Sequence, residues 1–363
     1  MTQPHFSIIL PTKDRVALVR DVLIHTTRQT FPDFEIILVD NGSDDSASRV
    51  AADICDSRIK ILRTGNLNMP DNWQAGIEAA SGKNLLMIED KLFFAVDALE
   101  QCADLIHRSG SPLVSWMVGE CDGPECPSLD RIGPCDFSTL PSREFFRYGS
   151  HCMLDRYQKQ APRGINMVVN RDFALKVQST TGRLCRPISP DYSMGALLLP
   201  ALESFAHTSM TLSRVLRRGP SNGANTGSRN AAAMAFLASL GMTDEELLQY
   251  VPLKIKTLHN LMVSDLFRFW RTAGVPESQV RLDLNGYFLM MIGDCVLMKK
   301  QNVEFGMERR QITAAFHARP LADRVAFLRY AFFRFVEGWP NRKLRMRENL
   351  PDAAKALGYL FKN

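Results

Sequence analysis

The chain has 363 residues, of which 45% are hydrophobic and 23% are charged, and its formal net charge is +5. This length predicts two domains, or one large domain with an appendage, and the hydrophobic fraction excludes a disordered or fibrous protein. A net charge this small gives no reason to expect a nucleic-acid partner. Much of the positive excess lies near the C-terminus, where Arg and Lys side chains crowd residues 319–347.

The first part of the chain alternates between short apolar runs and amphipathic segments. Strands are predicted at Phe6–Leu10, Phe34–Val39, Ile59–Leu62 and Leu85–Ile88, and helices at Val16–Thr27, Ala47–Ile54 and Asn72–Ala80. Strands that alternate with helices usually form a parallel sheet with helices on both faces. We therefore predict an α/β fold with a mostly parallel sheet.

The middle of the chain is less regular. Residues 119–164 are rich in Pro, Gly, Cys and charged residues, which is typical of a long binding loop. Beyond it we expect a strand at 164–169, helices from Arg171 and at 190–202, and a strand at Met210–Leu216.

From about residue 229 the pattern changes and only helices are expected. They are predicted at 231–240, from a capping box at Thr243–Glu246, and at about 252–273, 277–300, 308–317, 320–336 and 351–361. The sequence therefore predicts an α/β domain over residues 1–228 and an α-helical domain over residues 229–363.

The eight cysteines form no CxxC pair. Cys121, Cys126 and Cys135 share one loop-like stretch, followed by His151 and Cys152, but their spacings fit no common zinc site. Ordinary reduced thiols are therefore favoured over zinc. The N-terminus has no basic leader or cleavage site, and no apolar stretch is long enough to span a bilayer, so we expect a cytoplasmic protein.

Polar clusters directly follow three of the predicted strands. They are Thr12-Lys13-Asp14, Asp40-Asn41 and Glu89-Asp90-Lys91. In an open α/β sheet, ligands bind outside the carboxyl ends of the strands, so these clusters should share one ligand-binding edge.

Four stretches in the first third of the chain occur in a recognisable order and spacing. They are Phe6–Arg15, Gln29–Asp44, Gly65–Trp73 with Gly76, and Ala80–Asp90. Together they resemble the opening of family-2 glycosyltransferases, and the resemblance extends to about residue 223. It implies a GT-A Rossmann-like domain that binds a nucleotide sugar, with a UDP-sugar favoured as donor. It also implies a glycan or lipid-linked acceptor, in the synthesis of a cell-envelope polysaccharide or lipopolysaccharide-type glycan.

The resemblance also implies roles for single residues at the strand edge. Pro11, Thr12 and Asp14 would line the donor pocket beside the base and the ribose. Asp40 would hydrogen-bond the edge of the nucleobase, and Asn72 would lie near the diphosphate or the ribose.

The turn Glu89-Asp90-Lys91 stands in the place of the family's DxD motif, but Lys91 replaces the expected acidic ligand. A protonated lysine cannot ligate a metal. Three interpretations stay open. Asp90 or Glu89 holds Mg²⁺ or Mn²⁺, together with His207; Lys91 itself neutralises the diphosphate; or the site is degenerate and the protein is an inactive scaffold that binds a nucleotide sugar or a partner transferase.

Asp191, in the stretch Ser189–Ser193, matches the position of the family's catalytic base, which implies a single displacement with inversion. The alternative is that Asp191 only caps a helix. Arg218, in the basic loop that follows Arg214, could clamp a diphosphate or simply lie in a solvated turn. His207 could be a metal ligand or an ordinary structural histidine.

The segment Leu321–Glu337 combines Arg324, Arg329 and Arg334 with many aromatic residues. It could lie on an anionic membrane that carries a lipid-linked acceptor, giving peripheral contact through residues 319–347 at the inner face of the plasma membrane. Alternatively its aromatic residues fill the core of the helical domain. A sugar nucleotidyltransferase is a further alternative, but the first strand lacks the Gly-rich, basic triphosphate loop that such enzymes carry.

Overall fold

The computed structural model describes residues 3–121, 130–216 and 231–337. The chain divides into two compact units that are interleaved in sequence. Unit 1 comprises Met1–Phe145, Asp155–Gly219 and Phe269–Pro276, and unit 2 comprises Phe146–Leu154, Pro220–Arg268 and Glu277–Asn363. The sequence predicts a single domain boundary between residues 228 and 229, and this boundary remains a proposal.

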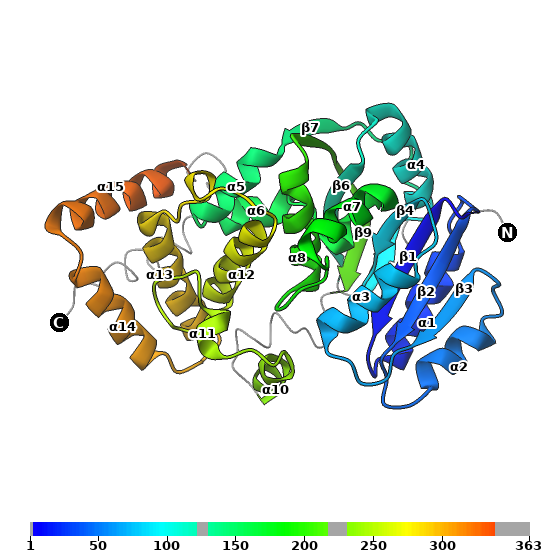
Figure 1. The fold of residues 1–363 in the computed structure, drawn as a ribbon, viewed down its shortest axis with the longest axis horizontal. Coiled ribbons are helices and arrows are strands. Elements are labelled where there is room, and N and C mark those ends of the chain that lie inside the picture. Colours follow the sequence, from blue (N-terminus) through cyan, green and yellow to red (C-terminus); the bar gives the residue numbers. More distant parts are fainter. Residues whose placement is uncertain (1–2, 122–129, 217–230, 338–363) are drawn as a thin grey trace. The chain divides into compact units, whose positions relative to one another are not determined.

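Unit 1 is built on one mixed sheet (Figure 1). Its strands, in chain order, are β1 (Phe6–Thr12), β2 (Phe34–Asp40), β3 (Ile59–Arg63), β4 (Asn84–Met87), β5 (Leu92–Phe94), β6 (Leu113–Cys121), β7 (Ser138–Pro141), β8 (Met167–Asn170) and β9 (Ser204–Leu216). They are arranged in the order β3-β2-β1-β4-β8-β6-β9-β5, and β7 also pairs with β9. The predicted α/β class is confirmed.

The direction of the strands was only partly predictable. β1, β2, β3 and β4 pair in parallel, as the alternation of strands and helices predicts. β8 runs antiparallel to both β4 and β6, and β5 and β7 run antiparallel to β9. Every residue of β1 and β2 is buried, which explains why these strands read as continuous apolar runs.

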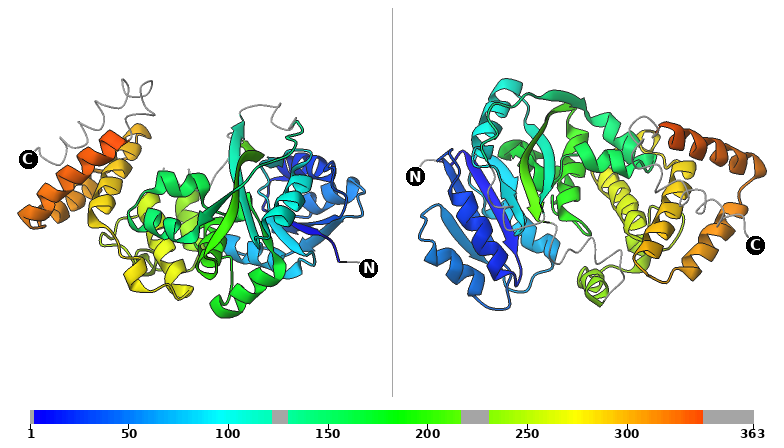
Figure 2. Two further views of the ribbon diagram at one scale, coloured as in Figure 1. Left: turned by 90° about the horizontal axis from the view of Figure 1, so that it is seen from above. Right: turned by 180° about the vertical axis from the view of Figure 1, so that it is seen from behind.

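Helices cover both faces of this sheet. The helices of this part of the chain are α1 (Val16–Thr27), α2 (Ser46–Asp53), α3 (Met69–Ala79), α4 (Ala98–Ser109), α5 (Ser142–Ser150), α6 (Leu154–Gln160), α7 (Arg171–Thr181) and α8 (Pro190–Leu198), with short 3₁₀ turns η1 (Gly164–Asn166) and η2 (Leu199–Ala201). α3 covers one face of the sheet in Figure 1, and α1 covers the other face, which is seen from behind in Figure 2.

Two sequence predictions in this unit were too simple. The helix expected at 190–202 ends at Leu198 and continues only as η2, which contains Pro200. The strand expected at Met210–Leu216 begins six residues earlier, at Ser204. Its register with β6 shifts around Met117, and this irregularity hides the strand's alternation in the sequence.

The described part of unit 2 is helical. Its elements are most of α5, α10 (Ala231–Ser239), α11 (Asp244–Leu247), most of α12 (Leu258–Thr272), η3 (Glu277–Gln279), α13 (Leu284–Lys300), α14 (Gly306–His317) and α15 (Leu321–Glu337). The predicted capping box is present, because the Thr243 hydroxyl accepts from Glu246 N and the Glu246 carboxylate accepts from Thr243 N. The helix predicted at 351–361 lies outside the described residues.

The core of unit 2 contains a chain of aromatic contacts. The ring of Phe316 lies 5.7 Å from that of Phe288 and 5.0 Å from that of Phe327, so α13, α14 and α15 pack through edge-to-face pairs. Among the described residues, we find no helix whose length and apolar character would let it cross a membrane.

Candidate active site

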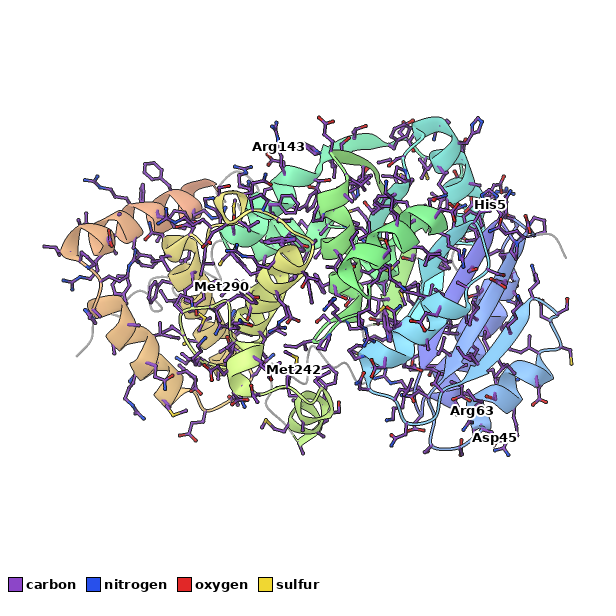
Figure 3. All side chains as sticks on the ribbon, viewed as in Figure 1. His5, Asp45, Arg63, Arg143, Met242 and Met290 are labelled. Atoms are coloured by element: carbon purple, nitrogen blue, oxygen red, sulfur yellow. The ribbon has the colours of Figure 1, made fainter. Side chains whose placement is uncertain are left out.

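Three predicted polar clusters lie at the carboxyl edge of the parallel half of the sheet. Thr12 ends β1 and is the register partner of Asp40, which ends β2. The Thr12 hydroxyl donates to the Asp90 carboxylate at 3.1 Å, which joins the turn after β4 to the same edge. Figure 3 shows this edge near Arg63, at the end of β3, whereas His5 marks the opposite edge where β1 begins.

Asp40 is completely buried and its carboxylate accepts four hydrogen bonds. Oδ1 accepts from Gly42 N at 2.9 Å, while Oδ2 accepts from the hydroxyl and backbone N of Ser48 and from Arg63 Nη1 at 3.3 Å. These bonds brace the β2–α2 turn and the start of α2. A nucleobase would have to compete with these donors, so the base-binding role of Asp40 stays a prediction.

Asn72 is likewise buried, and its Oδ1 accepts from the Thr64 hydroxyl at 2.6 Å. Its neighbour in space, Asn41, makes a two-way bond with the backbone of Leu67: its Nδ2 donates to Leu67 O and its Oδ1 accepts from Leu67 N, both at 2.7 Å. Asn41 and Asn72 therefore hydrogen-bond the segment between β3 and α3. The contact of Asn72 with a diphosphate stays a prediction.

The end of β1 and the short loop from Lys13 to Arg15 lead into α1. Pro11 is buried within β1. Asp14 has a positive φ of 55°, a conformation that Asp tolerates better than most residues. Its Oδ1 accepts from the backbone N and the hydroxyl of Ser43, at 2.7 and 2.9 Å. This bridge joins the loop after β1 to the loop after β2, at the edge where a donor is expected.

The turn that replaces the DxD motif uses Asp90 as an internal anchor. Asp90 is buried, its Oδ2 accepts from Thr12, and its Oδ1 forms an ion pair with Arg15 Nη1 at 3.0 Å. Lys91 is partly exposed. Its backbone O accepts from Leu216 N at 2.9 Å, which ties the turn to the end of β9. Sequence reasoning missed Arg15, although it lies inside the first family-like motif.

Asp191 lies in the first turn of α8, and its charge acts on Glu89 in the turn after β4. Burial raises the pKa of the Asp191 carboxyl, and the positive charge of Arg163 opposes that shift. Burial also raises the pKa of Glu89, and the charge of Asp191 adds to the effect while Lys91 counteracts it. The charge of Asp191 thus acts on the ionisation of a carboxyl from a distant part of the sequence.

Arg163 is the second residue that sequence reasoning missed. Its Nη1 donates to the hydroxyl of Tyr192 at 3.4 Å, and its Cζ lies 5.2 Å from the centre of that ring. The Tyr192 ring stacks on Tyr157, and the Arg163 Nε and the Tyr157 hydroxyl are buried without a hydrogen-bond partner. No sequence motif marks Arg163, because only tertiary packing brings residue 163 beside residue 191.

Two glycines allow this packing. A Cβ atom on Gly195 of α8 would lie 1.7 Å from Pro162 O, and a Cβ atom on Gly164 would lie 3.3 Å from the Cα of Asp191. The segment 162–164 therefore lies directly against α8. The Asn166 side chain also holds this segment in place. Its Oδ1 accepts from Arg163 N, and its Nδ2 donates to Trp116 O and Ala161 O.

His207 lies within β9 rather than beside the β4 turn. It is buried, its Nδ1 shares a hydrogen bond of 2.8 Å with the Ser115 hydroxyl on β6, and burial lowers its pKa. In the parts of the chain that the structure describes, no three His, Cys, Asp or Glu side chains gather into a group that could hold a metal. Asp90, with both oxygens engaged, and Lys91 beside it therefore fit a divalent ion poorly. The ligand roles of Asp90 and His207 stay predictions.

Two further sequence predictions concern residues within or next to the segments that the structure does not describe. Arg218 lies outside the described residues. Cys121 is disulfide-bonded, which corrects the expectation that the thiols are all reduced. Cys55, Cys102, Cys135, Cys152, Cys185 and Cys295 are not in disulfides. A disulfide at Cys121 removes that residue from any zinc site.

Residues 7–172 match the model of the family described as glycosyl transferase family 2. These residues form a family 2 glycosyl transferase domain. The match spans β1 to the start of α7, and so includes the Thr12–Asp90–Arg15 contacts and Arg163, while Asp191 lies beyond it. The resemblance noted from the four motifs is thus confirmed.

Similar proteins of known sequence are also glycosyltransferases by name. A PGL/p-HBAD biosynthesis glycosyltransferase of Mycobacterium bovis is 34% identical over 110 residues, which are 29% of this chain and 43% of the relative. An uncharacterized glycosyltransferase, EpsJ of Bacillus subtilis, is 33% identical over 81 residues, which are 22% of this chain and 24% of that protein. The chain thus spans less than half the length of these relatives. Among solved structures, S. aureus TarS 1-349 in complex with UDP-GlcNAc is 14% identical, with a TM-score of 0.47 over 80% of this chain and 81% of that chain.

Proposed function

We propose that the protein transfers a sugar from a nucleoside-diphosphate sugar to a hydroxyl of an acceptor, with inversion, and that Asp191 is the catalytic base. The observation that carries this proposal is the position of Asp191. It lies in the first turn of α8, within electrostatic reach of Glu89, whose turn follows β4 at the nucleotide edge of a family 2 glycosyl transferase domain.

The chemistry needs one base and one leaving group. The acceptor oxygen attacks the anomeric carbon while the bond from that carbon to the diphosphate oxygen breaks, and the hydroxyl proton passes to Asp191. A carboxylate whose pKa is raised by burial is a stronger base than an exposed one, which suits this transfer near neutral pH. The diphosphate leaves with its charge offset by cations at the strand edge.

The substitution Asp191→Asn tests this role. We expect the turnover of the donor and acceptor to fall by about 10²–10⁴-fold, while nucleotide binding is retained. Turnover would be measured as nucleotide release, and binding by isothermal calorimetry with UDP.

Asp172→Asn is the matched control. Asp172 is also the acidic residue in the first turn of a helix, α7, and it is exposed. If Asp191 only stabilises a helix end, the two variants will lose similar small amounts of stability and keep their turnover. That result would remove Asp191 from the catalytic machinery.

A non-catalytic scaffold that binds a nucleotide sugar or a partner transferase is the second candidate, and Lys91 is the feature that favours it. The two candidates differ in one measurement. The scaffold should show nucleotide binding but no turnover of any nucleotide sugar, and Asp191→Asn should then leave a partner transferase's activity unchanged.

For the donor we propose a UDP-sugar, to be compared with GDP- and dTDP-sugars by thermal shift, because a ligand that binds only the folded state raises its apparent stability. For the acceptor we propose a glycan or lipid-linked hydroxyl. The Mg²⁺ or Mn²⁺ cofactor implied by the family stays a prediction.

The acceptor proposal is supported by a surface on α15. Leu321, Val325, Leu328 and Phe332 are all exposed, the first and last at 68% and 64%. Their spacing of four, three and four residues places them on one stripe of the helix. Phe327 and Ala331 lie on another face and are buried, so the helix has an inner and an outer apolar face. We propose that the outer face rests on an anionic membrane.

A further inference from the structure

If the function proposed above is right, the family 2 domain binds a negatively charged diphosphate at an edge that carries several carboxyl groups, among them Asp14, Asp40, Glu89 and Asp90. Such an edge repels a diphosphate unless positive charge is placed there. The question is which group supplies that charge when position 91 holds a lysine instead of an acidic metal ligand.

Both oxygens of the Asp90 carboxylate already have a side-chain partner. Its side chain is only 6% exposed, Arg15 Nη1 lies 3.0 Å from Oδ1, and the Thr12 hydroxyl lies 3.1 Å from Oδ2. A divalent ion that approached Oδ1 would compete with the charge of Arg15, and one that approached Oδ2 would compete with the Thr12 hydroxyl. Lys91, next in the chain, has no lone pair to offer while it is protonated.

Arg15 is placed where a fixed positive charge is needed. It is the N-cap residue of α1 and follows directly on Asp14, whose carboxylate ties the loop to Ser43. The Arg15 side chain is 27% exposed, so it stays partly open to solvent while it is paired with Asp90. A guanidinium has five N–H donors, and one bond to Asp90 leaves others for a phosphate.

The ion pair also keeps Arg15 in position before a nucleotide arrives. Asp90 is held by Thr12 within the sheet edge, and Arg15 is held by Asp90, so little side-chain entropy remains to be lost when a phosphate binds. Lys91 adds a second positive charge one residue along the turn. Charge-assisted bonds from such groups to phosphate oxygens are among the stronger hydrogen bonds in proteins.

We propose that Arg15, anchored on Asp90, and Lys91 supply the positive charge that holds the diphosphate, so that nucleotide binding by this domain does not require a divalent metal. Asp90 is then a positioning residue for Arg15. This proposal rests on the function proposed above, because it assumes that the domain binds a nucleoside diphosphate.

The test measures the Kd of UDP, GDP and dTDP by isothermal calorimetry, for the full chain, in EDTA and in excess Mn²⁺. We expect at least one nucleotide to bind, with a Kd that changes less than about threefold between the two conditions. We expect Arg15→Ala to weaken that binding by about tenfold or more, and Arg15→Lys to weaken it less, because the charge is kept.

Arg20→Ala is the matched control. Arg20 is exposed on the same helix, so the variant loses the same charge away from the strand edge, and its nucleotide affinity should stay that of the unchanged protein. Circular dichroism of each variant checks that the fold is kept. A second variant, Lys91→Ala, should also weaken binding without making it depend on Mn²⁺.

The outcomes separate the two proposals. A nucleotide that binds tenfold or more tightly in Mn²⁺ than in EDTA, or an Arg15→Ala variant of unchanged affinity, would overturn the inference and leave the proposed function standing. If none of the three nucleotides binds in either condition, the proposed function itself fails.

Discussion

At the scale of single residues, Arg163 is the cation whose charge acts on Asp191. The other titratable groups that interact electrostatically with Arg163 are Glu89, Tyr157 and Tyr192. Burial raises the pKa of Asp191, and Arg163 limits that rise. Since a base works only when it is ionised, Arg163 should help set the lowest pH at which the enzyme is active.

We therefore predict that Arg163→Gln moves the acidic limb of the pH profile of kcat/KM upwards by about one unit. The sign follows from the charge: without the guanidinium, the pKa of Asp191 rises further, so a higher pH is needed to ionise it. Arg163→Lys keeps the charge and should keep the limb close to its original position. An unchanged limb with activity reduced equally at every pH would show that Arg163 has only a packing role.

At the scale of elements, the position of Asp191 depends on how closely α8 approaches the segment 162–164. Gly195 makes this approach possible, and an added methyl group would meet backbone rather than a flexible side chain. The helix α8 also passes its first turn over Gly164, so a shift of α8 would move Asp191 away from both Glu89 and Arg163.

We predict that Gly195→Ala destabilises the protein by about 1–3 kcal/mol or more and also lowers turnover. Gly293→Ala on α13 is the control. A Cβ atom there meets nothing within 4 Å, so the helix should be stabilised by about 0.5–1 kcal/mol. Urea unfolding and donor turnover measure the two effects. Similar stability changes in both variants would mean that the contact with Pro162 is looser than the structure shows.

At the scale of the whole molecule, the two compact units exchange short segments. Phe269–Pro276 belongs to unit 1, where Trp270 is fully buried and lies 6.4 Å from the ring of Tyr157. Tyr157 in turn stacks on Tyr192, the residue after Asp191. A segment from the helical half of the sequence thus supports the aromatic residues behind the proposed base.

The exposed apolar stripe of α15, formed by Leu321, Val325, Leu328 and Phe332, leads to a prediction about membrane binding. We predict that the full chain sediments with vesicles containing anionic lipid and that the double variant Leu328→Ser/Phe332→Ser reduces the bound fraction by at least about tenfold. Each exposed apolar side chain contributes about 1.5–3 kcal/mol when it is buried in the membrane interface. Met307→Ser, which changes another exposed apolar residue on α14, is the control. If the unchanged protein, the double variant and Met307→Ser bind the vesicles equally, this stripe is not the surface that contacts the membrane.

The sequence by itself determined the class of the fold and the sheet edge at which the polar clusters gather. Buried parallel strands are continuous apolar runs, and the polar residues that end them are adjacent in the sequence to those runs. The turns at Asp40 and Glu89–Lys91 can therefore be assigned to one edge of the sheet from the order of the residues alone. Asp191 could be singled out only through the resemblance to the family.

The tertiary structure alone decided what surrounds these residues. The antiparallel direction of β8 has no signature in hydrophobic periodicity, because a buried strand looks the same in either direction. The contacts of Arg15 with Asp90 and of Arg163 with Tyr192 join residues 75 and 29 positions apart. Such contacts depend on the packing of distant segments through Thr12, Gly164 and Gly195, so no local pattern could predict which cations serve the carboxyl groups of the site.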